Sequence, residues 1–134
     1  MRAVPDTNVL IASLISRGFC RELLEYCFFN HTLVTSESIL GELKEKLAEK
    51  FKYSTEIAEE AVELFRSRMQ VVIPAALSSP ISRDPDDDNI LAAALAGNCE
   101  CVITGDKDFE SERVFRARKS RIITHRRTMQ WTCR

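Results

Sequence analysis

The chain has 134 residues, 45% of them hydrophobic, which suits one compact domain with a sizeable core and leaves no room for a second. It contains no run of about 18 apolar residues and no basic-then-apolar signal sequence, so we expect a cytoplasmic protein with no membrane partner. The net charge of −1 excludes a global field that attracts a polyanion, and the five cysteines lack the C-x-x-C spacing of zinc and redox sites.

Short strand-like apolar runs alternate with longer helical ones, which predicts an α/β fold with a parallel sheet and helical crossovers. In chain order we expect a strand over 2–6, a helix from about Asn8, a helix around 19–28, a strand over 33–35, helices capped by Ser36 and Ser54, a short buried strand over 71–73, a loop over 80–86, a helix over 87–96, strands over 101–104 and 122–123, and a short C-terminal helix.

Carboxylates stand where predicted strands end or helices begin. Asp6 closes the first strand, and Asp106 follows the strand over 101–104. Because the carboxyl ends of parallel strands line one edge of a sheet, we expect Asp6 and Asp106 to meet. Asp88 has apolar residues three, four and seven positions later, so its side chain is expected to point inward with that stripe.

Helix capping is the alternative explanation for each of these aspartates, and the preferred one for Asp84, Asp86 and Asp87. It explains less well why several acids converge on one edge, where carboxylates about 5 Å apart repel by roughly 3 kcal/mol per pair. Such a cluster must take up protons or bind a multivalent cation. All-oxygen ligands favour Mg²⁺ or Mn²⁺, and Ca²⁺ is disfavoured because no D-x-D-x-D-G loop is present.

Four motifs, in this order, resemble those of the PIN-domain family. The segments are DTNVL at 6–10, SESILGEL at 36–43, DNILAAA at 88–94 and TGDKDF at 104–109. The RDPDDD run at 83–88 is most similar to the VapC-like subgroup, the toxins of toxin-antitoxin pairs. The resemblance spans nearly the whole chain and implies a single-domain, three-layer α/β/α fold around a central parallel sheet.

The resemblance also implies the catalytic residues. The metal-binding acids would be Asp6, Glu42, Asp88 and Asp106, with Asp108 as a supporting ligand. Helical geometry alone does not select Glu42, because it lies on one flank of its helix's apolar stripe and Glu37 lies on the other.

Neighbouring polar residues have two explanations. Thr7, Asn8 and Thr104 can orient the carboxylates or a phosphate oxygen, but turn and capping roles suit them equally well. Pro5 departs from the family, which usually has an aliphatic residue there. Proline removes a backbone N–H, so it is tolerable only at a strand end or a bulge.

The activity implied is a metal-dependent ribonuclease, with one or two Mg²⁺ or Mn²⁺ ions, that leaves 5′-phosphate and 3′-hydroxyl ends. A metal-free ribonuclease would need a paired acid and base, and the two isolated histidines, His31 and His125, argue against it. The alternative is a catalytically silent RNA- or partner-binding module on the same fold. A phospho-acceptor receiver domain is disfavoured because only Asp6, rather than a pair of acids, follows the first strand.

Acidic and basic residues are segregated along the chain. Residues 113–134 carry eight Lys or Arg and no acid, so the remainder stands at about −9. This basic segment is the candidate RNA-contacting surface, although a solvated face or an acidic protein partner would also explain it. The candidates are Arg113, Arg116, Arg118, Lys119, Arg121, Arg126 and Arg127. The resemblance implies RNA as the substrate, an antitoxin protein as a partner and a homodimer of the chain.

Overall fold

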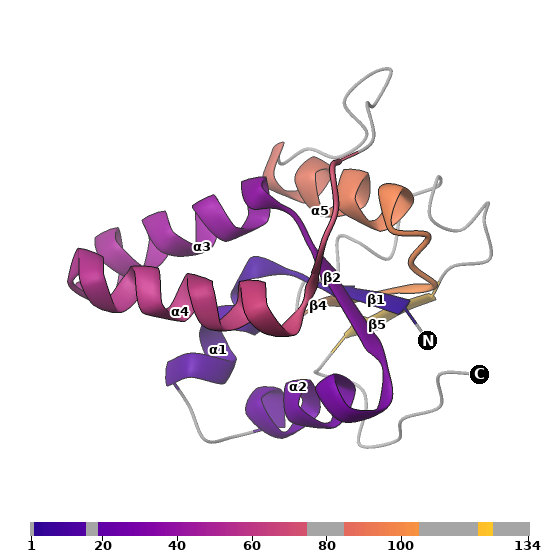
Figure 1. Ribbon diagram of the computed structural model, residues 1–134, viewed down its shortest axis with the longest axis horizontal. Helices are drawn as coiled ribbons and strands as arrows, with labels where there is room; N and C mark the ends of the chain where they lie inside the picture. Colours follow the sequence, from indigo (N-terminus) through magenta and orange to yellow (C-terminus); the bar gives the residue numbers. More distant parts are fainter. Residues whose placement is uncertain (1, 16–18, 75–84, 105–120, 125–134) are drawn as a thin grey trace.

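Strands and helices alternate along the computed structural model of the protein, as the sequence pattern predicts (Figure 1). The structure describes residues 2–15, 19–74, 85–104 and 121–124. The elements are β1 (Arg2–Pro5), α1 (Thr7–Ile15), α2 (Phe19–Asn30), β2 (Thr32–Thr35), α3 (Glu37–Glu49), α4 (Thr55–Arg68), β3 (Gln70–Val71), α5 (Pro85–Ala96), β4 (Cys101–Thr104) and β5 (Arg121–Thr124). None of the helices in these ranges is both long and apolar enough to cross a bilayer.

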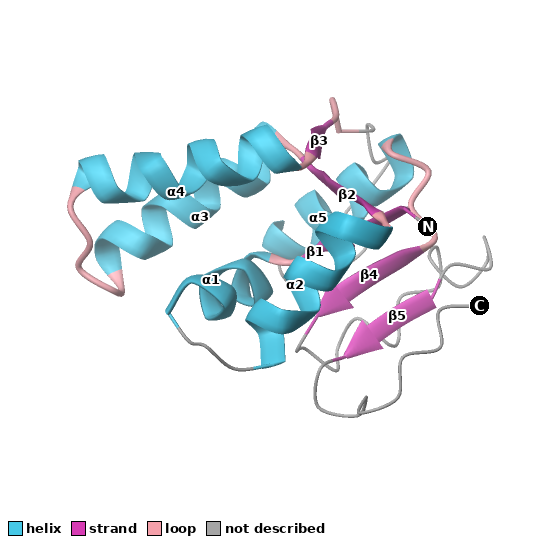
Figure 2. Cartoon of the chain, turned by 60° about the horizontal axis from the view of Figure 1, so that its bottom comes forward, coloured by secondary structure: helices cyan, strands magenta, loops and turns pink. Residues whose placement is uncertain are grey.

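The described strands form one parallel sheet in the order β3, β2, β1, β4, β5. Ala3 of the central strand pairs with Leu33 on one side and with Cys101 on the other. The chain thus moves outward from β1 to β3 and then returns across β1 to add β4. Because crossovers are right-handed, this change of direction places α5 on the face opposite α1 and α2 (Figures 1 and 2). The expected three-layer α/β/α fold is confirmed.

The middle of the sheet is buried on both faces. β4 is buried along its whole length, and β1 is buried from Ala3 to Pro5. Helices α1 and α2 contact β4 and β2 respectively, while α5 contacts β1, β2 and β4. Strands that are covered on both faces are continuous apolar runs, whereas half-exposed strands alternate apolar and polar residues. β1 and β4 follow the continuous pattern.

Helices α3 and α4 pack against each other and extend beyond the carboxyl edge of the sheet (Figure 1). The hydroxyls of Ser36 and Ser54 accept hydrogen bonds from the backbone N–H groups of Ile39 and Ile57, each at 3.3 Å. Both predicted N-caps are therefore confirmed. Because Ser36 follows β2 directly, its cap fixes the point where α3 leaves the sheet.

Two predicted elements differ from the structure. The strand expected to be buried over 71–73 is the two-residue strand β3, where Val71 is 37% exposed, and Ile73 beyond it is 91% exposed. β3 is at the edge of the sheet, where fewer neighbours cover the side chains. The helix expected from Asp87 begins at Pro85, so residues 85 and 86 are not part of a loop. Proline suits the first helical position, because the N–H that it lacks would have no partner there.

The turn from α5 into β4 is tightly packed. Asn98 has a φ of 51°, and the N–H of Cys99 donates to the carbonyl of Ala94 at 2.9 Å, which closes the helix with a left-handed residue. A side-chain carbon on Gly97 would lie 2.8 Å from Cγ1 of Val34. A side chain at position 97 would therefore collide with β2. The short C-terminal helix expected after residue 123 falls outside the described residues.

Candidate active site at the carboxyl edge of the sheet

Buried polar side chains gather at the carboxyl ends of β1, β2 and β4. In the described part of the chain the buried polar residues are Asp6, Thr7, Ser13, Thr35, Ser36 and Thr104, and all but Ser13 lie at a strand end or within two residues after it. The order of the strands reverses between β1 and β4. Open α/β sheets bind ligands in the crevice at such a switch point, so the candidate site is centred on Asp6 and Thr104.

Asp6 is held by both halves of this crevice. Its Oδ1 accepts the backbone N–H of Val9 at 2.8 Å, which caps α1. Its Oδ2 accepts a hydrogen bond from the Thr104 hydroxyl at the end of β4. Its own N–H donates to the carbonyl of Ile103 at 2.9 Å. Capping therefore explains only one carboxylate oxygen, while the other is oriented from the neighbouring strand.

Pro5 is compatible with the backbone hydrogen bond of Asp6 to β4. It is the last residue of β1, which is the strand-end position that a proline can occupy. Because the Asp6 N–H points to β4 and successive N–H groups alternate in direction, the Pro5 nitrogen faces β2. The β1–β2 pairing has its last register pair at Ala3 and Leu33, so proline removes no bond from the β1–β4 side that carries Asp6.

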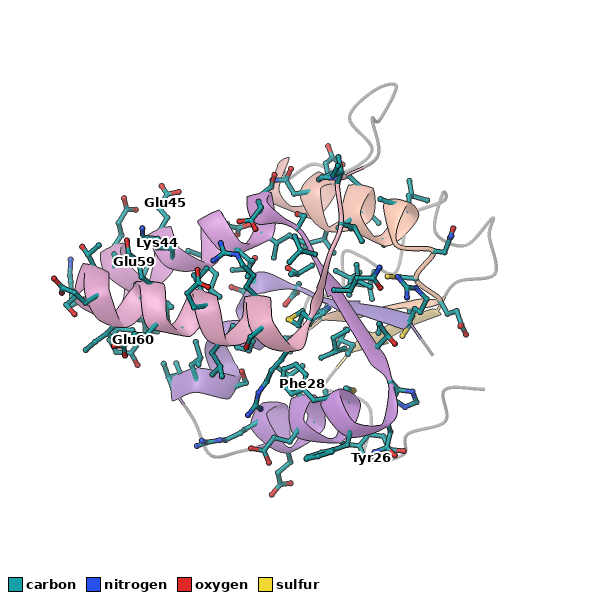
Figure 3. All side chains as sticks on the ribbon, viewed as in Figure 1. Tyr26, Phe28, Lys44, Glu45, Glu59 and Glu60 are labelled. Atoms are coloured by element: carbon teal, nitrogen blue, oxygen red, sulfur yellow. The ribbon has the colours of Figure 1, made fainter. Side chains whose placement is uncertain are left out.

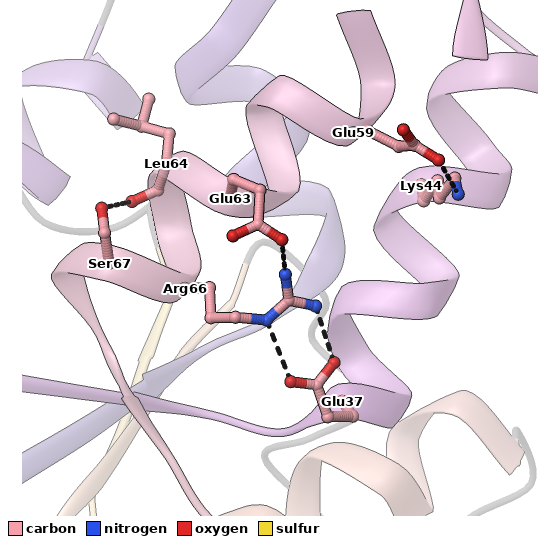
Figure 4. Close-up of polar contacts among 7 residues, drawn as sticks. All are labelled: Glu37, Lys44, Glu59, Glu63, Leu64, Arg66 and Ser67. Carbon is pink, nitrogen blue, oxygen red and sulfur yellow. Dashed lines mark hydrogen bonds and ion pairs between the residues drawn. The ribbon is translucent and has the colours of Figure 1, made fainter. Parts of the chain in front are cut away.

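The two glutamates that flank the apolar stripe of α3 have different environments. Glu37 accepts hydrogen bonds from Arg66 of α4 at 3.0 and 2.8 Å, and Arg66 also pairs with Glu63 (Figure 4). The hydrogen bonds from Arg66 lower the pKa of Glu37, whose side chain is 62% exposed. The side chain of Glu42 is only 11% exposed, and its carboxylate pairs with Lys46 at 2.7 Å. The two glutamates therefore differ in exposure, a difference that their positions along the helix do not predict.

Glu42 lies on the flank of α3 that faces away from α4. Lys44 bonds to Glu59 of α4 at 2.8 Å and marks the flank that α4 covers (Figure 4). Two residues correspond to about 200° around a helix, so Glu42 is on the other side. The other helices that α3 contacts are α1, which begins just after Asp6, and α5, which carries Asp88. Glu42 therefore lies on the side of the two helices that adjoin the predicted acids.

Asp88 is half-buried in the first turn of α5. Because the helix begins at Pro85, Asp88 is its fourth residue and does not hold the N-cap position. An N-cap side chain bonds to the N–H groups of the second and third helical residues. Capping in this sense does not account for Asp88.

The remaining predicted residues are divided between the edge and the undescribed part of the chain. Thr7 is buried at the start of α1, whereas Asn8 is exposed. Asp106, Asp108 and the basic candidates lie outside the described residues, except that the backbone of Arg121 begins β5. Within the described ranges, no three His, Cys, Asp or Glu side chains form a group that could hold a metal.

Thr35 is a residue of this edge that the sequence reasoning missed. It is fully buried at the end of β2, and no residue in the described ranges hydrogen-bonds to its hydroxyl or to that of Thr7. A buried hydroxyl without a partner is costly, which suits a position that meets a ligand. Its place at a strand end, like that of Thr104, was the available signal.

The donor atoms at this edge suit a hard divalent cation. The side chains of Asp6 and Thr35, at the ends of β1 and β2, present only oxygen, which Mg²⁺ and Mn²⁺ prefer. The thiol of Cys99 is buried before β4, at the opposite edge, and burial raises its pKa to about 12. The acids labelled in Figure 3, Glu45, Glu59 and Glu60, lie on the α3–α4 pair away from the sheet.

Comparisons with known proteins agree with this architecture. The family model described as PIN domain matches residues 2–108, a range that contains all four motif segments up to Asp108 and stops before the basic segment. Among solved structures, the chain resembles one in the crystal structure of VapBC2 from Rickettsia felis bound to a DNA fragment from their promoter. The TM-score is 0.68 at 17% identity, over 92% of this chain and 98% of that one, which shows a shared fold. No protein with a curated description matches the sequence.

Proposed function

The chain belongs to the PIN-domain family, and from this membership we propose that it is a metal-dependent ribonuclease that hydrolyses RNA phosphodiester bonds in the cytoplasm. The observation that carries the proposal is the position of Asp6. A buried carboxylate is fixed at the switch point of the sheet by Val9 on one oxygen and by Thr104 on the other. An ionised carboxylate is an oxygen ligand of the kind that hard divalent cations prefer.

We propose that Asp6, Glu42, Asp88 and Asp106 hold one or two Mg²⁺ or Mn²⁺ ions, with Asp108 as a supporting ligand. When bound, such an ion lowers the pKa of a water molecule and stabilises the charge that develops on the phosphate oxygens. The protein's own contribution is orientation. Thr104 sets the rotation of the Asp6 carboxylate, and the burial of Glu42 restricts its side chain to the flank of α3 that faces away from α4.

A metal-free mechanism has little support in the described part of the chain. His31 directly precedes β2 and so lies at the amino edge of the sheet, opposite the candidate site. Its ring packs edge-on against Tyr26 with centroids 5.7 Å apart, and partial burial lowers its pKa. His31 therefore cannot supply a general acid or base beside Asp6.

RNA contact is assigned to the basic segment. The residues proposed to bind phosphates are Arg113, Arg116, Arg118, Lys119, Arg126 and Arg127. A local basic surface is needed because the net charge of −1 provides no general attraction for RNA.

We also propose that the protein is the toxin of a toxin-antitoxin pair and forms a homodimer. Large apolar side chains on the described surface are consistent with protein partners: Phe29 of α2 is 89% exposed, and Ile57 and Leu64 are exposed seven positions apart on one side of α4. Light scattering of the purified chain should give the mass of two copies, and a monomer at micromolar concentration would refute the dimer. A small reading frame directly upstream would distinguish a toxin from a housekeeping nuclease.

Cleavage of single-stranded RNA tests the proposed activity. We expect cleavage with Mn²⁺ or Mg²⁺, none with chelator, and a loss of at least about two orders of magnitude in Asp6→Asn. Glu37→Gln is the matched control, because Glu37 is an exposed acid that bonds to Arg66 on the α4 flank. Full activity in Asp6→Asn or in chelator would reject the proposal, whereas RNA binding without cleavage would favour a silent binding module.

A further inference from the structure

The Glu42–Lys46 ion pair differs from the other ion pairs in the described part of the chain. Lys46 follows Glu42 by one helical turn on α3, and its Nζ lies 2.7 Å from Oε1 of Glu42. The two side chains are 22% and 11% exposed. In the Lys44–Glu59 pair, two residues away on the same helix, the corresponding exposures are 42% and 56%. Glu42 and Lys46 thus form the most enclosed of these pairs.

A stabilising role on the helix surface does not explain this enclosure. A solvated Glu–Lys pair one turn apart contributes only a few tenths of a kcal/mol to a helix, and it needs no burial to do so. Burying both charges removes them from water, which costs more than an exposed pair gains unless their geometry is good and their remaining atoms are satisfied. Stabilisation of the helix surface therefore gives no reason for the enclosure of this pair.

We propose that Lys46 is the counter-cation of the metal site: it holds and neutralises the Glu42 carboxylate while no metal ion is bound, and it yields that carboxylate to the ion. This inference rests on the proposed function, since it concerns the same acids. Lys46 is a positioning residue, because it acts on the metal through Glu42. Its ammonium offsets the charge of the Glu42 carboxylate, and in doing so it competes with the divalent cation for the same negative charge.

The two effects of Lys46 have opposite signs. Removing its charge should lower the melting temperature of the metal-free protein, because the carboxylate of Glu42, whose side chain is 11% exposed, would lose its ion pair with Lys46. The same change should tighten metal binding. A divalent ion and an ammonium about 5 Å apart repel, even at the dielectric constant of water, by an amount that corresponds to roughly tenfold or more in Kd. A residue with a purely structural role would not improve metal binding when it is replaced.

Isothermal titration with Mn²⁺ tests the inference on four proteins, the wild type, Lys46→Met, Lys46→Arg and Lys44→Met, alongside thermal melts in chelator. We expect Lys46→Met to bind Mn²⁺ about tenfold more tightly and to melt at a lower temperature in chelator. Lys46→Arg keeps the charge, and Lys44→Met removes the lysine of the exposed pair with Glu59, so both should keep the wild-type Kd within about twofold.

Each outcome is decisive. An unchanged or weaker Kd in Lys46→Met would overturn the role of Lys46 while leaving the metal site intact. Absence of Mn²⁺ binding by the folded wild type would overturn the metal site and, with it, this inference. If Lys46→Met does not fold in chelator, Lys46→Gln is titrated instead, and the same tenfold tightening is required.

Discussion

The hydroxyl of Thr104 donates a hydrogen bond to Oδ2 of Asp6, across 98 positions of the sequence. The contact joins the ends of β4 and β1, the neighbouring strands at which the order of strand addition reverses. The backbone makes the same connection, because the N–H of Asp6 donates to the carbonyl of Ile103 at 2.9 Å. A side chain and a backbone bond together fix the orientation of one carboxylate at the candidate site.

Replacing Thr104 with valine removes this hydroxyl with almost no change in shape. We predict a loss of about 10- to 100-fold in metal affinity or RNA cleavage, as for other residues that orient metal ligands. Stability should fall by about 1.5–3 kcal/mol, because a charged acceptor loses a buried donor. Urea unfolding and a cleavage assay measure the two effects.

Thr35→Val is the control for Thr104→Val. Thr35 is equally buried at the end of β2, but no described residue bonds to its hydroxyl. Its replacement should leave stability unchanged or raise it. Equal destabilisation by both substitutions would show that the Thr104 bond contributes nothing specific to Asp6.

Asp88→Asn tests electrostatic repulsion among the acids. In chelator the variant should be as stable as the wild type or more stable, since a repelling charge has been removed. In millimolar Mn²⁺ the order should reverse, because the wild type gains about 2.7 kcal/mol when the metal is at 100 times its Kd, or several degrees in Tm. Glu56→Gln, in the first turn of α4, should show no such reversal. An Asp88→Asn protein destabilised equally in both buffers would remove Asp88 from the metal site.

The two described glycines should respond to alanine in opposite ways. A Cβ on Gly97 would lie 2.8 Å from Val34 and 3.2 Å from the carbonyl oxygen of Ala93, so Gly97→Ala should cost about 1–3 kcal/mol. Gly41 lies within α3 with nothing within 4 Å of its Cβ position, so Gly41→Ala should stabilise by about 0.5–1 kcal/mol. Chemical denaturation measures both, and a neutral Gly97→Ala would contradict the close packing of α5 on β2.

The buried thiol of Cys99 predicts a loss of stability at alkaline pH. Burial raises its pKa to about 12 from a reference value of 9.0. Between these values the unfolded chain releases the proton and the folded chain keeps it, so stability falls as the pH rises above 9. Cys99→Ala lacks this contribution. Urea unfolding at pH 8 and pH 10.5 should therefore show a smaller decline for the variant, and parallel declines would refute the shift.

Local sequence signals predict where the elements lie better than they predict how deeply those elements are buried. Ser36 and Ser54 cap helices because capping depends on a few adjacent residues. Their positions were therefore readable from sequence. Val71 was expected in a buried strand, but its burial depends on which neighbours cover β3, and β3 is at the edge of the sheet. The starting residue of α5 was missed because Pro85 was interpreted as part of a loop.

The candidate site shows the same limit. Its location at the carboxyl edge followed from parallel strands, and Asp6 lies there as expected. The different surroundings of Glu37 and Glu42 depend on the position of α4, which engages Glu37 through Arg66 and leaves Glu42 on the other flank. The hydrogen bond from Thr104 to Asp6 joins residues 98 positions apart and depends on the rotation of both side chains. Motif spacing cannot predict such a contact.

The most direct test of the central claim is the chemical identity of the RNA ends that the purified protein produces in Mn²⁺. Metal-assisted attack by water leaves a 5′-phosphate and a 3′-hydroxyl, so a 5′-labelled RNA should give 3′ ends that poly(A) polymerase extends, and Asp6→Asn should give none. Cyclic phosphate ends that resist extension, formed equally by wild type and Asp6→Asn, would contradict the account. Such ends result from attack by the 2′-hydroxyl, and equal yields would show that Asp6 has no part in the reaction.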